Sequence, residues 1–319
     1  MKKNEFKVLF SKSIRFLLVF ILIDISLGFM AKEIFFSQKT GKYARLTYSI
    51  QKDSSEILIM GSSHANRHYV PNIIEKELNM TCYNAGVQGQ RLIFHTALQK
   101  MISKRHKPKF IILNIDESGL FESSESYERL ADLHPYYWDF RTELDPILSL
   151  HSEFITFKLL FRSYQTNSTI VHVLKYFFLP QKDFKGYRPL NQHMEKPQSQ
   201  KIGFINSKIA KDEIQKIDTS FVNMFKEFIN NAKLNDVKLI FTLSPHLYQV
   251  NELKVNKSLE LMKTMAFEHG IPLFDFSDNR TFIEQYHLFN DPGHLNNDGA
   301  IIFTKLLADT LKEKIELMK

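Results

Sequence analysis

The segment Glu56–Asn66 has the sequence EILIMGSSHAN, and the interpretation of the whole chain starts from it. Its four apolar residues, 57–60, form a continuous run that is typical of a strand buried on both faces of a parallel sheet. Gly61 ends the run, and two serines and a histidine follow directly. Open α/β folds build their sites at the carboxyl ends of such strands. We therefore expect a serine nucleophile here if a base and a carboxylate are supplied elsewhere.

A base and a carboxylate occur together in Asp291-Pro292-Gly293-His294, just before a predicted C-terminal helix. An i, i+3 spacing in a loop can bring the aspartate and the histidine to one side. The sequence therefore predicts a serine–histidine–aspartate triad made by His294, Asp291 and either Ser62 or Ser63.

The two motifs, GSSH after a strand and DPGH before the last helix, together resemble the SGNH (GDSL-like) hydrolase superfamily. The resemblance runs from about residue 56 to the C-terminus, and the middle third matches poorly. The G-S-S form is similar to the membrane-anchored branch that includes the D-alanyl-lipoteichoic acid transfer protein and alginate O-acetyltransferases. The resemblance implies that Ser63 is the nucleophile, that Ser62 takes the place of the family aspartate, and that Asp291 and His294 complete the triad.

The same resemblance implies oxyanion donors. Gly86, within Asn84–Gln90, is similar to the family glycine whose N–H binds the oxyanion, because a residue without Cβ lets the backbone come close. An Asn-Ala-Gly sequence is equally ordinary in a strand-to-helix turn. The family's third motif, G-x-N-D, is not present after the apolar run 110–115. Asn114 is its nearest counterpart, and Asp116 is either part of that motif or a polar cap of the strand.

The rest of the chain alternates predicted strands and helices. Strands are predicted at 80–83, 110–115, 237–243 and 271–276, and helices at 64–78, 95–106, 214–232, 259–269 and 296–317. This alternation predicts an α/β fold, a parallel sheet flanked by helices with right-handed crossovers. The arrangement resembles the three-layer SGNH-hydrolase and flavodoxin-like folds.

Residues from about 120 to 200 interrupt this alternation and are rich in aromatic residues. Helical spacing predicts a helical insertion, which we expect to cover the carboxyl edge of the sheet. Its aromatic residues suit either a glycan or acyl-chain cleft or a small core of their own. Tyr137, Trp138 and Arg188 are the predicted substrate contacts, together with His246, which follows the strand 237–243 at the same edge.

Residues 1–31 are predicted to be a signal anchor, followed by a stalk or surface helix at 32–55 and the main domain at 56–319. Five Lys and Arg residues precede the apolar segment 16–31, which favours an N-terminus inside the cytoplasmic membrane and a main domain outside. The segment is short for a membrane span, so a cleaved signal peptide is the alternative. Asp24 is either a tolerated polar residue or a contact with a polytopic membrane partner.

Composition and charge restrict the classes of partner and cofactor that we expect for this protein. The net charge of +7 comes from scattered lysines without a basic stripe, which disfavours nucleic acid and favours an anionic membrane or glycan. Cys82 is the single cysteine, so the chain has no internal disulfide. Histidine spacings typical of zinc hydrolases are missing, and no metal or other cofactor is expected.

Three functions remain open from the sequence. The first is an extracytoplasmic serine O-acyl esterase or O-acyltransferase that acts on a cell-surface glycan through an acyl-enzyme. The second is an inactive SGNH-like domain that binds glycan or partners in a surface-polysaccharide assembly. The third is a purely structural anchor protein. The altered first motif and the missing third motif support the second function.

Overall fold

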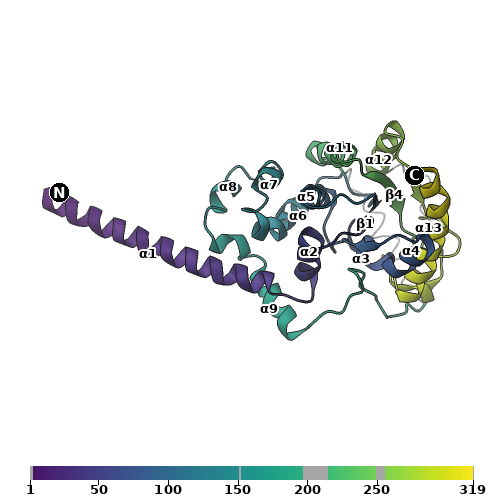
Figure 1. Cartoon of the computed structure of the whole chain (residues 1–319), viewed down its shortest axis with the longest axis horizontal. Coiled ribbons are helices and arrows are strands. Elements are labelled where there is room, and N and C mark those ends of the chain that lie inside the picture. The colour runs from purple at the N-terminus through teal and green to yellow at the C-terminus, as the bar shows by residue number, and fades with distance from the viewer. Residues whose placement is uncertain (1–2, 151, 197–214, 249–255, 319) are drawn as a thin grey trace. The chain divides into compact units, whose positions relative to one another are not determined.

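The computed structural model describes residues 3–150, 152–196, 215–248 and 256–318 (Figure 1). The chain divides into two compact units. Unit 1 comprises 1–44 and 127–181, and unit 2 comprises 45–126 and 182–319. All five strands of the main sheet belong to unit 2.

Unit 2 is built on a five-stranded parallel sheet. Its strands are β1 Ile57–Met60, β2 Cys82–Asn84, β3 Phe110–Asn114, β4 Lys238–Leu243 and β5 Leu273–Asp275. They lie in the order β2-β1-β3-β4-β5, and every neighbouring pair is parallel. β1 and β3 are buried along their whole length, which explains why both are continuous apolar runs rather than alternating ones. The predicted parallel α/β fold is confirmed.

Helices cover both faces of this sheet (Figure 1). They are α3 Ser63–His68, α4 Pro71–Leu78, α5 Leu92–Ser103, α11 Thr219–Leu234, α12 Lys257–Glu268 and α13 Asn297–Met318. On one face, Ile59 and Ile112 of the sheet share a core with Phe303 of α13. On the other face, α11 packs on α5, and the ring of Phe225 lies 5.3 Å from that of Phe241 in β4.

The strand order places a topological switch point at the carboxyl ends of β1 and β3. From β1 the chain passes to β2 on one side and then to β3 on the other. The connections therefore diverge and leave a crevice, which is where open α/β sheets bind ligands. The register pairs Met60 with Leu113, so the residues that follow these two strands meet at the same edge.

Some boundaries of helices and strands differ from the prediction, because prolines, caps and turns determine where these elements begin and end. The helix predicted at 64–78 is two helices, because Pro71 starts α4 and the preceding Val70 is extended. The helix predicted from 214 begins at Thr219, where the side chain of Asp218 caps it. The predicted Asp-Pro-Gly-His loop is a hairpin formed by β6 Phe289–Asp291 and β7 His294–Leu295.

Unit 1 consists of the long helix α1 Lys3–Phe36 and the helical insertion. The insertion contains the 3₁₀ helix η1 Arg129–Tyr136, α7 Arg141–Leu148, α8 Ile155–Lys158, the 3₁₀ helix η2 Ser163–Thr166 and α9 Ile170–Phe178. α1 is long and apolar enough to be a membrane anchor or a signal sequence. It continues past residue 31, where we expected the anchor to end.

The segment predicted as a stalk or surface helix, 32–55, contains the end of α1 and the helix α2 Lys42–Gln51. Residues 127–181 of the predicted insertion group with α1. Its coverage of the sheet edge stays a prediction, and its last residues, 197–200, lie outside the described residues.

We predict that Phe303→Ala destabilises unit 2 by about 3–5 kcal/mol, because it leaves a cavity in the core. The ring is fully buried, with its centroid 5.1 Å from Tyr69 and 5.4 Å from Phe276. The matched control is Ile302→Ala on the same helix, where the side chain is 39 % exposed and the loss should stay below about 1 kcal/mol. Hydrogen–deuterium exchange of the β1 and β3 amides in the full-length protein measures the loss of stability in both variants. Equal losses of stability in Phe303→Ala and Ile302→Ala would contradict the assigned core.

Candidate active site

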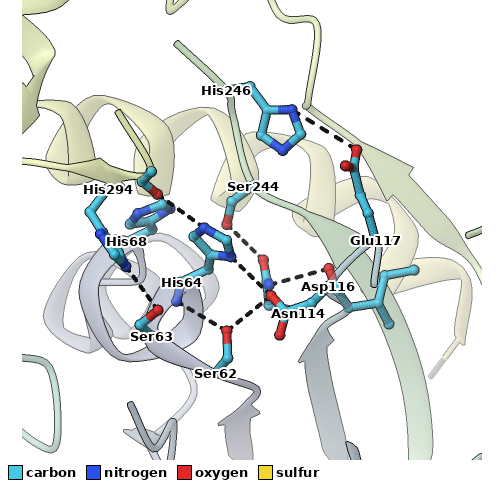
Figure 2. Close-up of polar contacts among 12 residues, drawn as sticks. Ser62, Ser63, His64, His68, Asn114, Asp116, Glu117, Ser244, His246 and His294 are labelled. Atoms are coloured by element: carbon cyan, nitrogen blue, oxygen red, sulfur yellow. Dashed lines mark hydrogen bonds and ion pairs between the residues drawn. The ribbon is translucent and has the colours of Figure 1, made fainter. Parts of the chain in front are cut away.

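Ser63, His294 and Asp291 form a continuous hydrogen-bonded chain, of which Figure 2 shows the link between Ser63 and His294. Nε2 of His294 lies 2.8 Å from Oγ of Ser63, and Nδ1 lies 2.8 Å from Oδ1 of Asp291. Ser63 is the first residue of α3, directly beyond β1, whereas the other two residues lie about 230 positions later in the β6–β7 hairpin. The fold therefore brings the predicted triad together in a hydroxyl–imidazole–carboxylate order, the arrangement that activates a serine.

The hairpin explains why an i, i+3 spacing works. Asp291 and His294 are direct partners across the β6–β7 pair, and Pro292 and Gly293 form the turn between them. Oδ1 of Asp291 also accepts a hydrogen bond from the Gly293 N–H at 3.0 Å. Burial by itself raises the pKa of Asp291, but the hydrogen bonds from His294 and Gly293 lower it more, so the carboxyl stays ionised.

Gly61 allows the sharp turn from β1 into α3. Its φ of 135° is disfavoured for residues with a side chain, and an added Cβ would lie 2.7 Å from the carbonyl oxygen of Asn114. Beyond it, the Ser62 side chain caps α3 and donates to Oδ1 of Asp116 at 2.9 Å. Ser62 thus bonds a carboxylate while Ser63 bonds an imidazole, which supports Ser63 as the nucleophile.

The His64 ring links two distant segments of the site. Nδ1 lies 2.9 Å from Oδ1 of Asp116, and Nε2 lies 3.0 Å from the carbonyl oxygen of Gly293. Both partners are acceptors only, and a neutral imidazole has a single N–H. His64 must therefore carry two protons to make both bonds, and it is then a cation between β3 and the hairpin.

His68 lies one helical turn after His64 and also binds the hairpin, but it accepts a hydrogen bond where His64 donates one. Its Nε2 accepts the Leu295 N–H at 3.0 Å, so the ring proton is on Nδ1. Burial, followed by the positive charges of its neighbours His64 and His294, lowers its pKa well below 6.5. A neutral His68 and a charged His64 thus bind the backbone on either side of His294.

Neighbouring charges separate the pKa values of His64 and His294. Burial lowers the pKa of His294 below 6.5, Asp291 opposes this, and the charge of His64 lowers it further. Burial also disfavours a charged His64, but its hydrogen bond and attraction to Asp116 outweigh this and raise its pKa above 6.5. The ring centroids lie 5.6 Å apart. Between the two pKa values one ring is therefore a free base and its neighbour a cation.

The predicted oxyanion donors have other partners in the structure. The Gly86 N–H donates to Oδ1 of Asn84 at 2.9 Å, and an added Cβ would lie 2.6 Å from the Asn66 nitrogen of α3. Close packing against α3 is enough to require a glycine there. Oδ1 of Asn114 accepts from Ser244 at 2.6 Å and from Tyr69, while Nδ2, the group that would bind an oxyanion, donates to the Ile115 carbonyl oxygen at 3.4 Å. Both oxyanion roles stay predictions. The Ser63 N–H lies at the start of α3, where the helix provides no acceptor.

The predicted substrate contacts are distributed over both units. Tyr137 and Trp138 belong to unit 1, where their rings pack on each other with centroids 5.5 Å apart. Arg188 belongs to unit 2, and its backbone bonds the Asn66 carbonyl and the Arg67 guanidinium. His246 follows β4 and faces Glu117 at 4.0 Å (Figure 2). The structure brings only Arg188 and His246 into the unit that holds the triad.

The roles of three residues, His64, His68 and Asp116, are not predicted from the sequence. The sequence predicts the two histidines only as part of a helix over 64–78, and it leaves Asp116 open between a motif residue and a cap of the strand. The signal that points to the two histidines is their spacing, which places both on one face of a helix that begins with Ser63.

Comparison with known proteins gives distant structural similarity alone. No family model and no curated protein matches the sequence. A protein from Desulfitobacterium hafniense DCB-2, assigned to the G-D-S-L family of lipolytic proteins, is 10% identical with a TM-score of 0.39, over 79% of this chain and 97% of that one. A Bacteroides fragilis NCTC 9343 protein, assigned as an acylhydrolase, is 10% identical with a TM-score of 0.38, over 87% and 99%.

A gut microbial diltiazem-metabolizing enzyme is 13% identical with a TM-score of 0.36, over 81% of this chain and 47% of that one. Because all these TM-scores are below 0.5, we draw nothing about activity from them.

We predict that His64 holds both ring protons at neutral pH, whereas His294 holds one. Spectra of ¹⁵N-histidine-labelled full-length protein distinguish the two forms, and the His64→Gln and His294→Gln variants assign the signals. As the pH rises, the imidazolium signal of His64 should persist above 6.5, the ordinary histidine pKa, and that of His294 should disappear below it. A His64 ring that is already neutral at pH 6.5 would contradict the two-acceptor geometry.

Proposed function

We propose that the protein is a serine O-acyl esterase or O-acyltransferase that works through an acyl-enzyme at Ser63. The hydrogen-bonded chain Ser63–His294–Asp291, with 2.8 Å at each link, is the observation that supports this function. The resemblance of its two motifs to SGNH hydrolases and the switch-point position of the nucleophile agree with it.

In the first half-reaction, Ser63 Oγ attacks the carbonyl carbon of an ester and His294 Nε2 takes the hydroxyl proton. The tetrahedral oxyanion then collapses, the ester C–O bond breaks, and His294 returns the proton to the leaving alcohol. Asp291 keeps the Nδ1 proton in place and stabilises the imidazolium that forms. The Ser63 N–H, which has no helical acceptor, would bind the developing oxyanion, and the nearby His64 cation would add favourable charge.

In the second half-reaction, an acceptor hydroxyl attacks the acyl-enzyme while neutral His294 takes its proton. With water as the acceptor the reaction is hydrolysis, and with a sugar hydroxyl it is acyl transfer. Both outcomes need the same triad. The choice depends on whether an acceptor sugar is held over Ser63 when the acyl-enzyme is present.

We propose a cell-surface glycan as the substrate, with the main domain outside the cytoplasmic membrane. The positive charges before the apolar part of α1 favour a cytoplasmic N-terminus. Arg67 and Arg188 of unit 2 place two positive charges near each other, which suits an anionic glycan. Their proximity shows in the pKa of Arg67, which burial, followed by the charge of Arg188, lowers to about 10. An acyl donor, delivered by a polytopic membrane partner, would complete a transferase.

An inactive SGNH-like scaffold that binds glycan or partner proteins is the second candidate. One specific observation favours it. The Gly86 N–H, which an active family member would direct at the oxyanion, is occupied by the Asn84 side chain at 2.9 Å. Losing one such donor costs about 3–4 kcal/mol in the transition state, so a site without it would be slow unless the loop rearranges.

We predict that Ser63→Ala abolishes labelling by a fluorophosphonate probe, which needs an activated serine. Ser62→Ala is the matched control next to it and should keep most of the labelling, because Ser62 bonds Asp116 rather than an imidazole. His294→Ala should lower the labelling rate about as much as Ser63→Ala, and Asp291→Asn by about 10⁴-fold, since triad members act as one unit. Wild-type protein that does not label at all would instead establish the inactive scaffold.

We predict a bell-shaped pH dependence of the labelling rate. The rate should rise as His294 loses its proton, below pH 6.5, and fall when His64 loses its proton, above pH 6.5. His64→Gln removes a cation that lowers the pKa of His294. The alkaline limb should therefore vanish and the acidic limb should move to higher pH. An unshifted acidic limb in His64→Gln would show that the two rings are not coupled.

A further inference from the structure

The apolar part of α1, residues 16–31, carries one carboxylate, Asp24, and the insertion supplies its hydrogen-bond donors. Oδ2 of Asp24 accepts the Arg162 N–H at 2.8 Å, and Oδ1 accepts the Ser163 N–H at 3.1 Å and the Ser163 hydroxyl at 2.6 Å. These N–H groups start the 3₁₀ helix η2, where no helical acceptor is available. Asp24 and η2 therefore satisfy each other's polar groups.

Close backbone packing reinforces this contact one turn further along α1. A Cβ at Gly28 would lie 2.3 Å from Cβ of Arg162 and 2.8 Å from the Ser163 nitrogen, so only a glycine fits. Earlier on the same helix, the ring of Phe20 meets that of Phe161 edge-on, with centroids 6.0 Å apart. The segment 161–163 thus follows α1 from Phe20 to Gly28.

The position of Asp24 along α1 sets the depth of this contact in a bilayer. Arg15 is the last basic residue before the apolar part of the helix and marks its cytoplasmic boundary. At 1.5 Å per residue, Asp24 lies about 13 Å beyond Arg15. A hydrocarbon core of about 30 Å places it near the midplane. A carboxylate there needs partners, and the partners that it has are the insertion's own backbone and Ser163.

The surface of the insertion is apolar where it continues from this contact. The exposed large apolar residues of the insertion are Leu150, Phe154, Phe157, Leu160, Val171, Leu174, Phe177, Phe178 and Leu179. In α9 they form a stripe outward while Val173 faces inward. The described part of unit 2 has several times as many residues as the insertion, yet it exposes only six large apolar side chains. So concentrated a patch marks an interaction surface.

We propose that residues 154–179 enter the outer half of the bilayer that α1 crosses, so that lipid acyl chains cover this apolar surface. The occupant is lipid because the surface is continuous with α1, whose own side chains from Phe16 to Met30 are almost all exposed within unit 1. In Figure 1 the N-terminal part of α1 stands clear of the other unit 1 helices, which gather at its C-terminal part.

The positions of three basic residues in the insertion agree with its placement in the outer half of the bilayer. Lys158 and Lys175 are exposed at the ends of α8 and α9, where their long side chains can reach the phosphate level. The Arg162 guanidinium lies 5.3 Å from the Trp138 ring centroid, which shields its charge. α1 is then part of a folded membrane unit and is kept as an anchor, because removing it would expose Ser163 and Phe161.

Environment-sensitive labels in the full-length chain test the proposal. In a Cys82→Ala background, Phe157→Cys and Phe178→Cys are labelled with a nitrobenzoxadiazole dye and reconstituted in phosphatidylcholine–phosphatidylglycerol vesicles. We expect blue-shifted emission and several-fold stronger quenching by lipids with doxyl groups on the acyl chains than at a matched aqueous site. That site is Phe267→Cys in unit 2, since Phe267 is 87% exposed and Phe178 82%.

A label at Phe16→Cys confirms that α1 itself is inserted. Acyl-chain quenching at 157 and 178 that is no stronger than at 267, with α1 inserted, would overturn the proposal. Shielding from water that appears only at a high protein-to-lipid ratio would overturn it too, because a second copy of the chain would then cover the patch.

A pair of substitutions in α1 separates docking from insertion. Gly28→Leu blocks the approach of Arg162, whereas Ser26→Leu adds the same apolar side chain at an exposed position. We expect Gly28→Leu to abolish acyl-chain quenching of the 157 label and Ser26→Leu to preserve it, with both proteins still inserted. Equal quenching in the two variants would contradict the assigned contact. None of these measurements depends on catalytic activity.

Discussion

The Asp116 carboxylate determines how the site holds together. Its Oδ1 accepts hydrogen bonds from Ser62 and His64, both at 2.9 Å. A carboxylate that is mostly shielded from water must be paired, so the first turn of α3 is drawn to the end of β3. His64, charged by this pairing, then donates to Gly293 and fixes the hairpin that carries His294. Ser63 and His294, the proposed nucleophile and base, are thus aligned through one ion pair as well as through their own hydrogen bond.

The sequence predicted those parts of the fold whose signals are local. β1 and β3 are apolar runs with clear ends, and both are buried along their whole length. The triad was predictable because each half carries its residues within four positions: the serine follows a strand, and Asp291 and His294 flank a proline–glycine turn. Once the strands were ordered, the carboxyl edge of the sheet was the place where both halves had to meet.

The remaining features depend on pairs far apart in the chain, which no local pattern encodes. Nothing in GSSH shows that His64 faces two acceptors, because one acceptor comes from β3 and the other from a turn 229 residues later. The same holds for Asp24, whose partners lie 138 and 139 positions away. Gly86 illustrates the opposite case, since a glycine expected for an oxyanion is already required by its close packing against α3.

The first motif differs from that of the SGNH superfamily, which it resembles, and the difference has a physical counterpart in this chain. Where the first motif of the family has an aspartate, this chain has Ser62, so a negative charge is lost from the end of β1. Asp116 at the end of β3 restores it, because its carboxylate bonds the Ser62 hydroxyl directly. The carboxylate next to Ser62 thus comes from the neighbouring strand, and His64 is its counter-ion. In the esterase that we propose, Asp116 would take the structural place of the aspartate that the first motif does not have.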